Sequence, residues 1–114
     1  MSELSAASLR IHECRPGQPR LSPETINEAL TTLPGWSLSA TASGDALQKT
    51  WQFTDYYRTM AFVNAVAWIA NQQDHHPELD VRYNRCGVTF STHDAGGITL
   101  NDLICAARVD ALGG

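Results

Sequence analysis

Residues 71–94 read NQQDHHPELDVRYNRCGVTFSTHD, and this stretch predicts the element around which the fold is built. On both sides of Asn84, apolar residues alternate with polar ones, which is the period-two pattern of half-buried strands. We therefore predict a β-hairpin. With Asn84 and Arg85 as its two turn residues, the ladder pairs Leu79 with Phe90 and His76 with His93. The apolar positions are Leu79, Val81 and Tyr83 before the turn, and Cys86, Val88 and Phe90 after it.

Three of the chain's four histidines, His75, His76 and His93, meet at the open end of this hairpin. The Asn-Arg pair lacks the glycine typical of the tightest turns. A turn running to Gly87 would shift the register by two residues, but His93 would still lie beside the His-His-Pro segment. In either register, His76 and His93 share a polar face while the opposite face packs into the core. The sequence thus predicts a polar site lined by imidazoles.

Start and stop signals place the remaining elements. Ser22 before Pro23 predicts a helix that ends at Pro34, and Thr54 is the expected cap of a long helix reaching Gln73. Strands are expected over 36–40 and 46–53, and a last helix is expected after Thr99, with Asp102 returning the cap. The order α-β-β-α-β-β-α predicts an α+β fold, an antiparallel four-stranded sheet with helices packed on one face. Residues 1–20, broken by proline and glycine, are expected to form a flexible N-terminal arm before a single domain over 21–114.

Composition narrows the function classes. The chain has 114 residues, a formal charge of −4 and a pI near 5.4, which argues against a nucleic-acid partner. Its three cysteines form no CxxC pair and are expected to be reduced thiols in the cytoplasm. No apolar run has the length of a signal peptide or a membrane span, so we expect a soluble cytoplasmic protein with no membrane partner. A domain this small has a limited core, which favours oligomerisation.

The histidine cluster admits several interpretations. Single histidines are most often surface residues or hydrogen-bonded core groups. A metal site could draw on Asp74, Asp80 or Asp94, but adjacent histidines rarely point the same way and no HxH or HExxH spacing occurs. Ser91 lies near His93 without a nucleophile elbow. Metal-free general acid-base chemistry suits the set best, because imidazole titrates near neutral pH. We therefore expect no metal and no cofactor.

The same residues carry a family resemblance. His-His-Pro at 75–77, Tyr83 six residues on, His93 ten beyond that and Asp102 in ITLND resemble the pattern of the pterin-4a-carbinolamine dehydratases. The likeness extends more loosely from Leu21 to Leu112 and includes the Pro-Gly-Trp of 34–36. The first 20 residues fall outside it.

The resemblance implies an enzyme, a 4a-hydroxytetrahydrobiopterin dehydratase of the carbon-oxygen lyase class. It would remove water from 4a-hydroxytetrahydropterin to give quinonoid dihydropterin, recycling the pterin of aromatic amino-acid hydroxylases, with the pterin as substrate rather than cofactor. By the resemblance, His75 and His93 would be general acids, and His76 would orient the pterin and assist proton removal. The pocket would be lined by these three histidines with Asp74, Ser91, Thr92 and Asp94, and Asp102 would support the site by holding the last helix.

The resemblance also leaves alternatives. Asn71 is neutral where family members often carry an ionisable residue. Relatives form dimers of dimers, so a homodimer or homotetramer is expected, and a functional link to a hydroxylase is implied. The rival function is a non-enzymatic binding or assembly factor, associated with RuBisCO and carboxysomes or acting as a transcription-factor dimerisation cofactor. The retained His75, His76 and His93 favour the enzyme.

Overall fold

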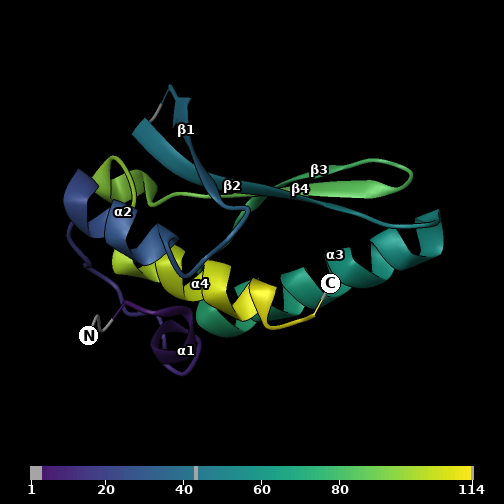
Figure 1. Cartoon of the computed structure of the whole chain (residues 1–114), viewed down its shortest axis with the longest axis horizontal. Coiled ribbons are helices and arrows are strands. Elements are labelled where there is room, and N and C mark those ends of the chain that lie inside the picture. The colour runs from purple at the N-terminus through teal and green to yellow at the C-terminus, as the bar shows by residue number, and fades with distance from the viewer. Residues whose placement is uncertain (1–3, 43, 114) are drawn as a thin grey trace.

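A computed structural model describes residues 4–42 and 44–113 of the chain. Four antiparallel strands form one sheet in the order β1-β2-β4-β3, and the longer helices cover one of its faces (Figure 1). The predicted α+β fold and element order are therefore confirmed, with a short helix and a 3₁₀ turn added. The elements are α1 (Ala6–Leu9), α2 (Pro23–Leu30), β1 (Ser37–Thr41), β2 (Gly44–Gln52), α3 (Tyr56–Gln73), β3 (Glu78–Val81), β4 (Arg85–Phe90), η1 (His93–Ala95) and α4 (Leu100–Asp110).

The core lies between the sheet and the helices. Leu47 of β2 and Val88 and Phe90 of β4 are fully buried beneath Val66 of α3 and Leu103 of α4. Burying a side chain of this size stabilises the fold by about 1.5–3 kcal/mol. An aromatic group continues the core toward the start of α3, where the Trp51 and Phe62 ring centroids lie 4.9 Å apart. The open face of the sheet stays polar, as the alternating pattern predicts.

The predicted register of the β3–β4 hairpin is wrong by two residues. Leu79 pairs with Val88 rather than Phe90, and the turn is Tyr83-Asn84 rather than Asn84-Arg85. Contacts from outside the hairpin explain the shift. The Asn84 carbonyl accepts the Phe53 N–H at 2.7 Å, and the Tyr83 carbonyl accepts the Thr59 hydroxyl at 2.9 Å. A shift of two residues keeps every side chain on its predicted face, so the core pattern survives while His76 and His93 are no longer opposite each other.

Helix caps follow the sequence at two of three starts. The Ser22 hydroxyl accepts the Thr25 N–H at 3.2 Å, and the Asp102 carboxylate accepts the Thr99 N–H at 2.8 Å, both as predicted. At α3 the cap is Asp55 rather than Thr54, because the Asp55 carboxylate accepts the Arg58 N–H at 2.8 Å. Within the described residues, no helix is both long and apolar enough to span a membrane.

The N-terminal segment packs against the domain. Leu9 of α1 is 1% exposed and belongs to the hydrophobic core, and α1 lies alongside α4. Farther along, the Arg15 N–H donates to the Asn101 side chain at 3.0 Å, and the Asn101 amide donates to the Arg15 carbonyl at 2.8 Å. The flexibility of residues 1–20 in solution stays a prediction, and residues 1–3 lie outside the described residues. The contacts of Leu9 and Arg15 give the described part of the segment a defined place on the fold.

Replacing Leu9 by alanine tests the contribution of this segment. Because Leu9 is buried in the core, Leu9→Ala should lower the free energy of unfolding by about 2–5 kcal/mol. Ile11→Ala is the matched control, since Ile11 is 75% exposed and its truncation should change stability by less than about 0.5 kcal/mol. Urea denaturation followed by tryptophan fluorescence measures both. Equally small changes in the free energy of unfolding at the two positions would mean that Leu9 does not pack in the hydrophobic core in solution.

Candidate functional site

The end of α3 fixes the direction of the histidine pair. Asp74 takes a left-handed backbone conformation with φ 51°, and the His75 N–H donates to the Ala70 carbonyl at 3.1 Å. This is the hydrogen bond of a Schellman-type helix end, in which the chain turns sharply away from the helix axis. A non-glycine residue with positive φ is uncommon, although aspartate tolerates it better than most. The turn directs His75 toward the core side of the sheet and leads His76 into β3.

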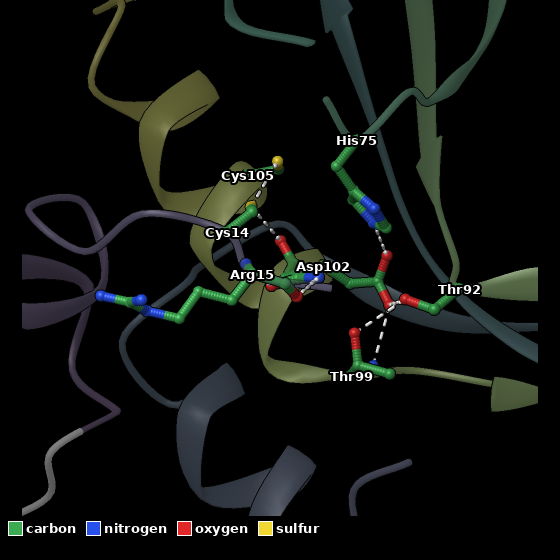
Figure 2. Close-up of polar contacts among 8 residues, drawn as sticks. Cys14, Arg15, His75, Thr92, Thr99, Asp102 and Cys105 are labelled. Carbon is green, nitrogen blue, oxygen red and sulfur yellow. Dashed lines mark hydrogen bonds and ion pairs between the residues drawn. The ribbon is translucent and has the colours of Figure 1, made fainter. Parts of the chain in front are cut away.

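His75 is paired with a buried carboxylate. Its Nε2 atom lies 2.6 Å from Asp102 Oδ1, and the two side chains point toward each other in Figure 2. The side chain of Asp102 is 0% exposed and that of His75 is 13% exposed. The imidazole also lies nearly parallel to the Phe90 ring, at 10° and 6.1 Å between centroids. The ring is therefore held on an apolar surface with one nitrogen bound to a carboxylate.

The second oxygen of Asp102 joins two other segments to the site. Oδ2 accepts the Thr99 N–H and the Thr92 hydroxyl, each at 2.8 Å, and the two threonine hydroxyls lie 2.7 Å apart (Figure 2). Because the Thr92 hydroxyl donates its proton to the carboxylate, the Thr99 hydroxyl must be the donor in the bond between the two threonines. Such bonds to an ionised acceptor are stronger than neutral ones, and they offset the cost of burying the charge.

The environment tunes the proton affinity of His75. Burial alone would lower the pKa of His75, but the hydrogen bond to Asp102 and the negative charge of its carboxylate outweigh burial and raise that pKa above its ordinary value. The Nδ1 atom has no hydrogen-bond partner among the described residues. In the part of the chain that the structure describes, every side-chain nitrogen or oxygen that is fully buried has a hydrogen-bond partner. Since Nδ1 of His75 has none, this atom is in contact with solvent. His75 thus has one anchored nitrogen and one nitrogen available for proton exchange.

A tight loop presents His93 at the surface. Thr92 and Gly97 form an isolated antiparallel bridge, with the Thr92 N–H donating to the Gly97 carbonyl at 2.8 Å. The intervening residues form η1, closed by a left-handed Gly96 with φ 72°. His93 is exposed at the start of this turn, next to the threonine that binds Asp102. The loop therefore fixes the backbone of His93 relative to the His75–Asp102 pair.

The structure joins some of the predicted site residues by hydrogen bonds and leaves others only adjacent in sequence. His75, Thr92 and Asp102 form one bonded network. His76 is exposed just before β3, and Asp74, Ser91, His93 and Asp94 flank the network on the segments that carry it. No side-chain bond joins His76 or His93 to another described residue. The functional site itself and the roles of its individual side chains stay predictions.

Sequence reasoning missed the contribution of the N-terminal segment. The Cys14 N–H donates to the buried Gln73 side chain at 2.8 Å, one residue before Asp74, and the Cys14 sulfur lies beside α4 (Figure 2). Arg15 exchanges two hydrogen bonds with Asn101, the neighbour of Asp102. The Cys14–Gln73 contact joins residues 59 positions apart, and the Arg15–Asn101 contact joins residues 86 positions apart. No local motif in the sequence signals either contact.

Comparison with known proteins settles the family. The model of the family "Pterin 4 alpha carbinolamine dehydratase" matches residues 19–112. The chain belongs to this family. A relative from Chromobacterium violaceum, provisionally named a pterin-4-alpha-carbinolamine dehydratase, is 56% identical over 101 residues, covering 87% of this chain and 90% of that protein. A relative from Bdellovibrio bacteriovorus with the same provisional name is 48% identical, covering 97% of this chain and 92% of that protein.

Two solved structures resemble this dehydratase-family chain. The first is a transcriptional coactivator/pterin dehydratase from Brucella melitensis, with TM-score 0.74 and 35% identity, covering 83% of this chain and 99% of that one. The second is a pterin dehydratase-like protein described as a RuBisCO assembly factor in the alpha-carboxysome, with TM-score 0.60 and 26% identity, covering 70% and 90%. The family fold therefore occurs in proteins described as dehydratases and in one described as an assembly factor.

Metal binding was the main alternative for the histidines. Among the residues that the structure describes, no three histidine, cysteine, aspartate or glutamate side chains are grouped so as to hold a metal ion. The expectation of a metal-free site stays a prediction that chelation can test.

Replacing Asp102 by asparagine tests the source of the His75 pKa shift. The amide keeps the shape of the carboxylate but lacks its charge, so the pKa of His75 in Asp102→Asn should fall below the wild-type value. A titration of the His75 ring by NMR measures it. Asp80→Asn is the matched control, because Asp80 is exposed and bonded to Arg82, and it should leave His75 unchanged. An unchanged pKa in Asp102→Asn would contradict the assignment.

The same shift predicts a pH dependence of stability. A pKa raised in the folded state means that folding favours the imidazolium, whose contribution is complete below the unfolded pKa of about 6.5. That contribution is lost as pH rises through the folded-state pKa. The free energy of unfolding of the wild type should therefore decline over this window relative to that of His75→Gln. Parallel stability curves for the two proteins would show that His75 is not coupled to folding.

Proposed function

We propose that this member of the family dehydrates 4a-hydroxytetrahydropterin, of the 4a-hydroxytetrahydrobiopterin type, to quinonoid dihydropterin and water. The observation that carries the proposal is the His75–Asp102 pair, with Nε2 bound to a buried carboxylate and Nδ1 left for proton exchange. Family membership supports the class of substrate. The reaction needs a group that gives up a proton near neutral pH, and an imidazole with a modestly raised pKa suits that need.

In the proposed reaction, the His75 imidazolium donates its Nδ1 proton to the 4a-hydroxyl. The carbon–oxygen bond then breaks with its electron pair leaving on oxygen, so water departs. A base removes a proton from the neighbouring ring atom, and the double bond of the quinonoid product forms there. His76 is proposed to orient the pterin and assist this proton removal, and His93 is proposed as the acid for the opposite face of the ring.

Asp102 is a positioning residue in this mechanism. Its carboxylate orients the imidazole and stabilises the cationic form, while its own bonds to Thr92 and Thr99 keep it in place. The Thr92 hydroxyl already has two partners, which favours a supporting role for that side chain over direct contact with the pterin. Ser91, Asp94 and Asp74 remain the proposed polar lining of the pocket. Each positioned acid or base of this kind contributes roughly 10²- to 10⁴-fold in rate.

Oligomerisation and the metabolic link are part of the same proposal. Large hydrophobic side chains stand exposed on α3, among them Tyr57 and Trp68. Exposed apolar side chains gathered on one element often mark a protein–protein interface, so they support the proposal of a homodimer or homotetramer. A functional link to an aromatic amino-acid hydroxylase would supply the hydroxylated pterin.

An assembly role is the second candidate. The 26% identity to a protein described as a RuBisCO assembly factor favours it, because a shared scaffold can serve binding alone. The His75–Asp102 pair favours the enzyme, because a histidine held by a buried carboxylate, with its other nitrogen free, is suited to proton transfer, which binding alone does not require.

Alanine substitutions at His75 and His93 test the catalytic proposal. The purified protein should accelerate dehydration of synthetic 4a-hydroxytetrahydropterin, followed by absorbance. His75→Ala and His93→Ala should each lose roughly 10²- to 10⁴-fold of the catalysed rate. His12→Ala is the matched control, because His12 is an exposed histidine in the arm whose ring is hydrogen-bonded to the Ser8 carbonyl. A wild-type rate equal to that in buffer would support the assembly role instead.

Chelation tests the metal-free part of the proposal. Overnight treatment with a strong chelator, followed by desalting, should leave both the dehydration rate and the thermal midpoint unchanged. Elemental analysis of the untreated protein is the companion measurement. Stoichiometric bound zinc together with a rate lost on chelation and restored by zinc would contradict the proposed mechanism.

A further inference from the structure

Two thiols lie close together beside the candidate site. The Cys14 and Cys105 sulfur atoms are 3.6 Å apart, although the residues are 91 positions apart in sequence. Cys14 belongs to the N-terminal arm and Cys105 to α4, one turn beyond Asp102, and Figure 2 shows both sulfurs near the His75–Asp102 pair. The third cysteine, Cys86, is buried in β4, where its thiol donates to the Gly87 carbonyl at 3.8 Å. The proximity of Cys14 and Cys105 has no part in the proposed dehydration.

The arm holds Cys14 in this position. Its backbone N–H is bound to Gln73 at 2.8 Å, and the next residue, Arg15, exchanges two hydrogen bonds with Asn101. The guanidinium of Arg108 donates to the His12 carbonyl at 2.6 Å. Bonds on both sides of Cys14 thus fix its backbone against α3 and α4. These hydrogen bonds, and not only the contact between the two thiols, hold the Cys14 sulfur beside the Cys105 sulfur.

The two thiols differ in exposure and acidity. Cys14 is partly exposed, whereas Cys105 is fully buried. The hydrogen bond from Cys105 lowers the pKa of Cys14, and the positive charge of His75 acts in the same direction. The hydrogen bond to Cys14 and burial raise the pKa of Cys105. A partly exposed thiol of lowered pKa beside a buried thiol is the arrangement of an attacking and a resolving cysteine.

We propose that Cys14 and Cys105 form a reversible intramolecular disulfide that fastens the N-terminal arm to α4 next to the His75–Asp102 pair. A disulfide has an S–S distance of about 2.05 Å, so the sulfurs must approach by roughly 1.5 Å. We expect rotation of the Cys14 side chain on its anchored backbone to bring the sulfurs together. Cys14 lies outside the residues 19–112 that match the family model, whereas Cys105 lies inside them, so the bond would join the arm to the matched domain.

The oxidation balances with a peroxide as oxidant. The Cys14 thiol loses its proton, its sulfur attacks the outer peroxide oxygen, and the O–O bond breaks. Cys14 becomes a sulfenic acid, and the leaving oxygen takes up the released proton and departs as an alcohol or water. Oxidation of Cys14 breaks the hydrogen bond between the two thiols, which is the largest cause of the raised pKa of Cys105. Cys105 then attacks the Cys14 sulfur, the S–S bond forms and the S–O bond breaks, and the Cys105 proton leaves with the hydroxide as water. Two thiols lose two electrons, and the peroxide bond gains them. A dithiol reductant reverses the change.

Peptide mapping of the oxidised protein tests this proposal. The folded protein is treated with a small excess of hydrogen peroxide, its remaining thiols are alkylated, and it is digested without reductant. Trypsin leaves Cys14 in the peptide 11–20, since Arg15 precedes Pro16, but leaves Cys86 and Cys105 together in 86–108. Chymotrypsin cleaves after Phe90 and separates these two cysteines. We expect Cys14 linked to Cys105, free Cys86, a loss of two hydrogens in intact mass, and full reversal by dithiothreitol.

Cys14→Ser is the control variant, because Cys14 lies in the arm and is not buried in the core. It should fold as the wild type does and form no intramolecular disulfide under the same treatment. Protein oxidised first in denaturant is the second control, since it should give mixed pairings if native proximity directs the bond. The proposal is overturned if folded wild type keeps two unlinked thiols at Cys14 and Cys105 under peroxide. It is also overturned if Cys86 pairs as readily as Cys105.

Discussion

The buried carboxylate of Asp102 binds three separate parts of the chain at once. One oxygen holds the imidazole of His75 at the end of α3, and the other holds Thr92 after β4 and the Thr99 N–H at the start of α4. A charge at this depth is costly unless several donors surround it, and removing any one of them leaves part of that cost uncompensated. The ends of two helices and one strand are therefore fixed relative to one another by a single side chain.

This constraint joins fold and chemistry. The same carboxylate that caps α4 raises the pKa of His75 and anchors its Nε2 atom. Because Asp102 serves both purposes, the acid-base properties of the site depend on how the helix begins. The arm also contacts the residues beside the site. It is hydrogen-bonded to Gln73, which precedes Asp74, and to Asn101, which precedes Asp102. The same fold occurs in a protein described as a transcriptional coactivator/pterin dehydratase and in one described as a RuBisCO assembly factor.

Local patterns predicted most of the fold and only part of the site. Alternation in β3 and β4 and the Ser22 and Asp102 caps depend on near neighbours, so they could be read directly. The hairpin register could not be predicted from near neighbours. It depends on hydrogen bonds from Thr59 and Phe53, which lie outside the hairpin, to the carbonyls of Tyr83 and Asn84. The sequence placed Asp102 as a helix-start residue beside the site. It did not reveal the direct bond to His75 or the contacts of Cys14, which form only when distant segments pack together.

The tautomer of neutral His75 gives the most direct test of this account. A carboxylate without a proton can only accept, so Nε2 must keep its proton when the ring loses its charge. In uniformly ¹⁵N-labelled protein at a pH well above the His75 pKa, the ring nitrogen shifts should show a protonated Nε2 and a bare Nδ1. A proton on Nδ1, or rapid exchange between the two nitrogens, would mean that Asp102 does not hold this ring, and the proposed acid-base role of His75 would lose its basis.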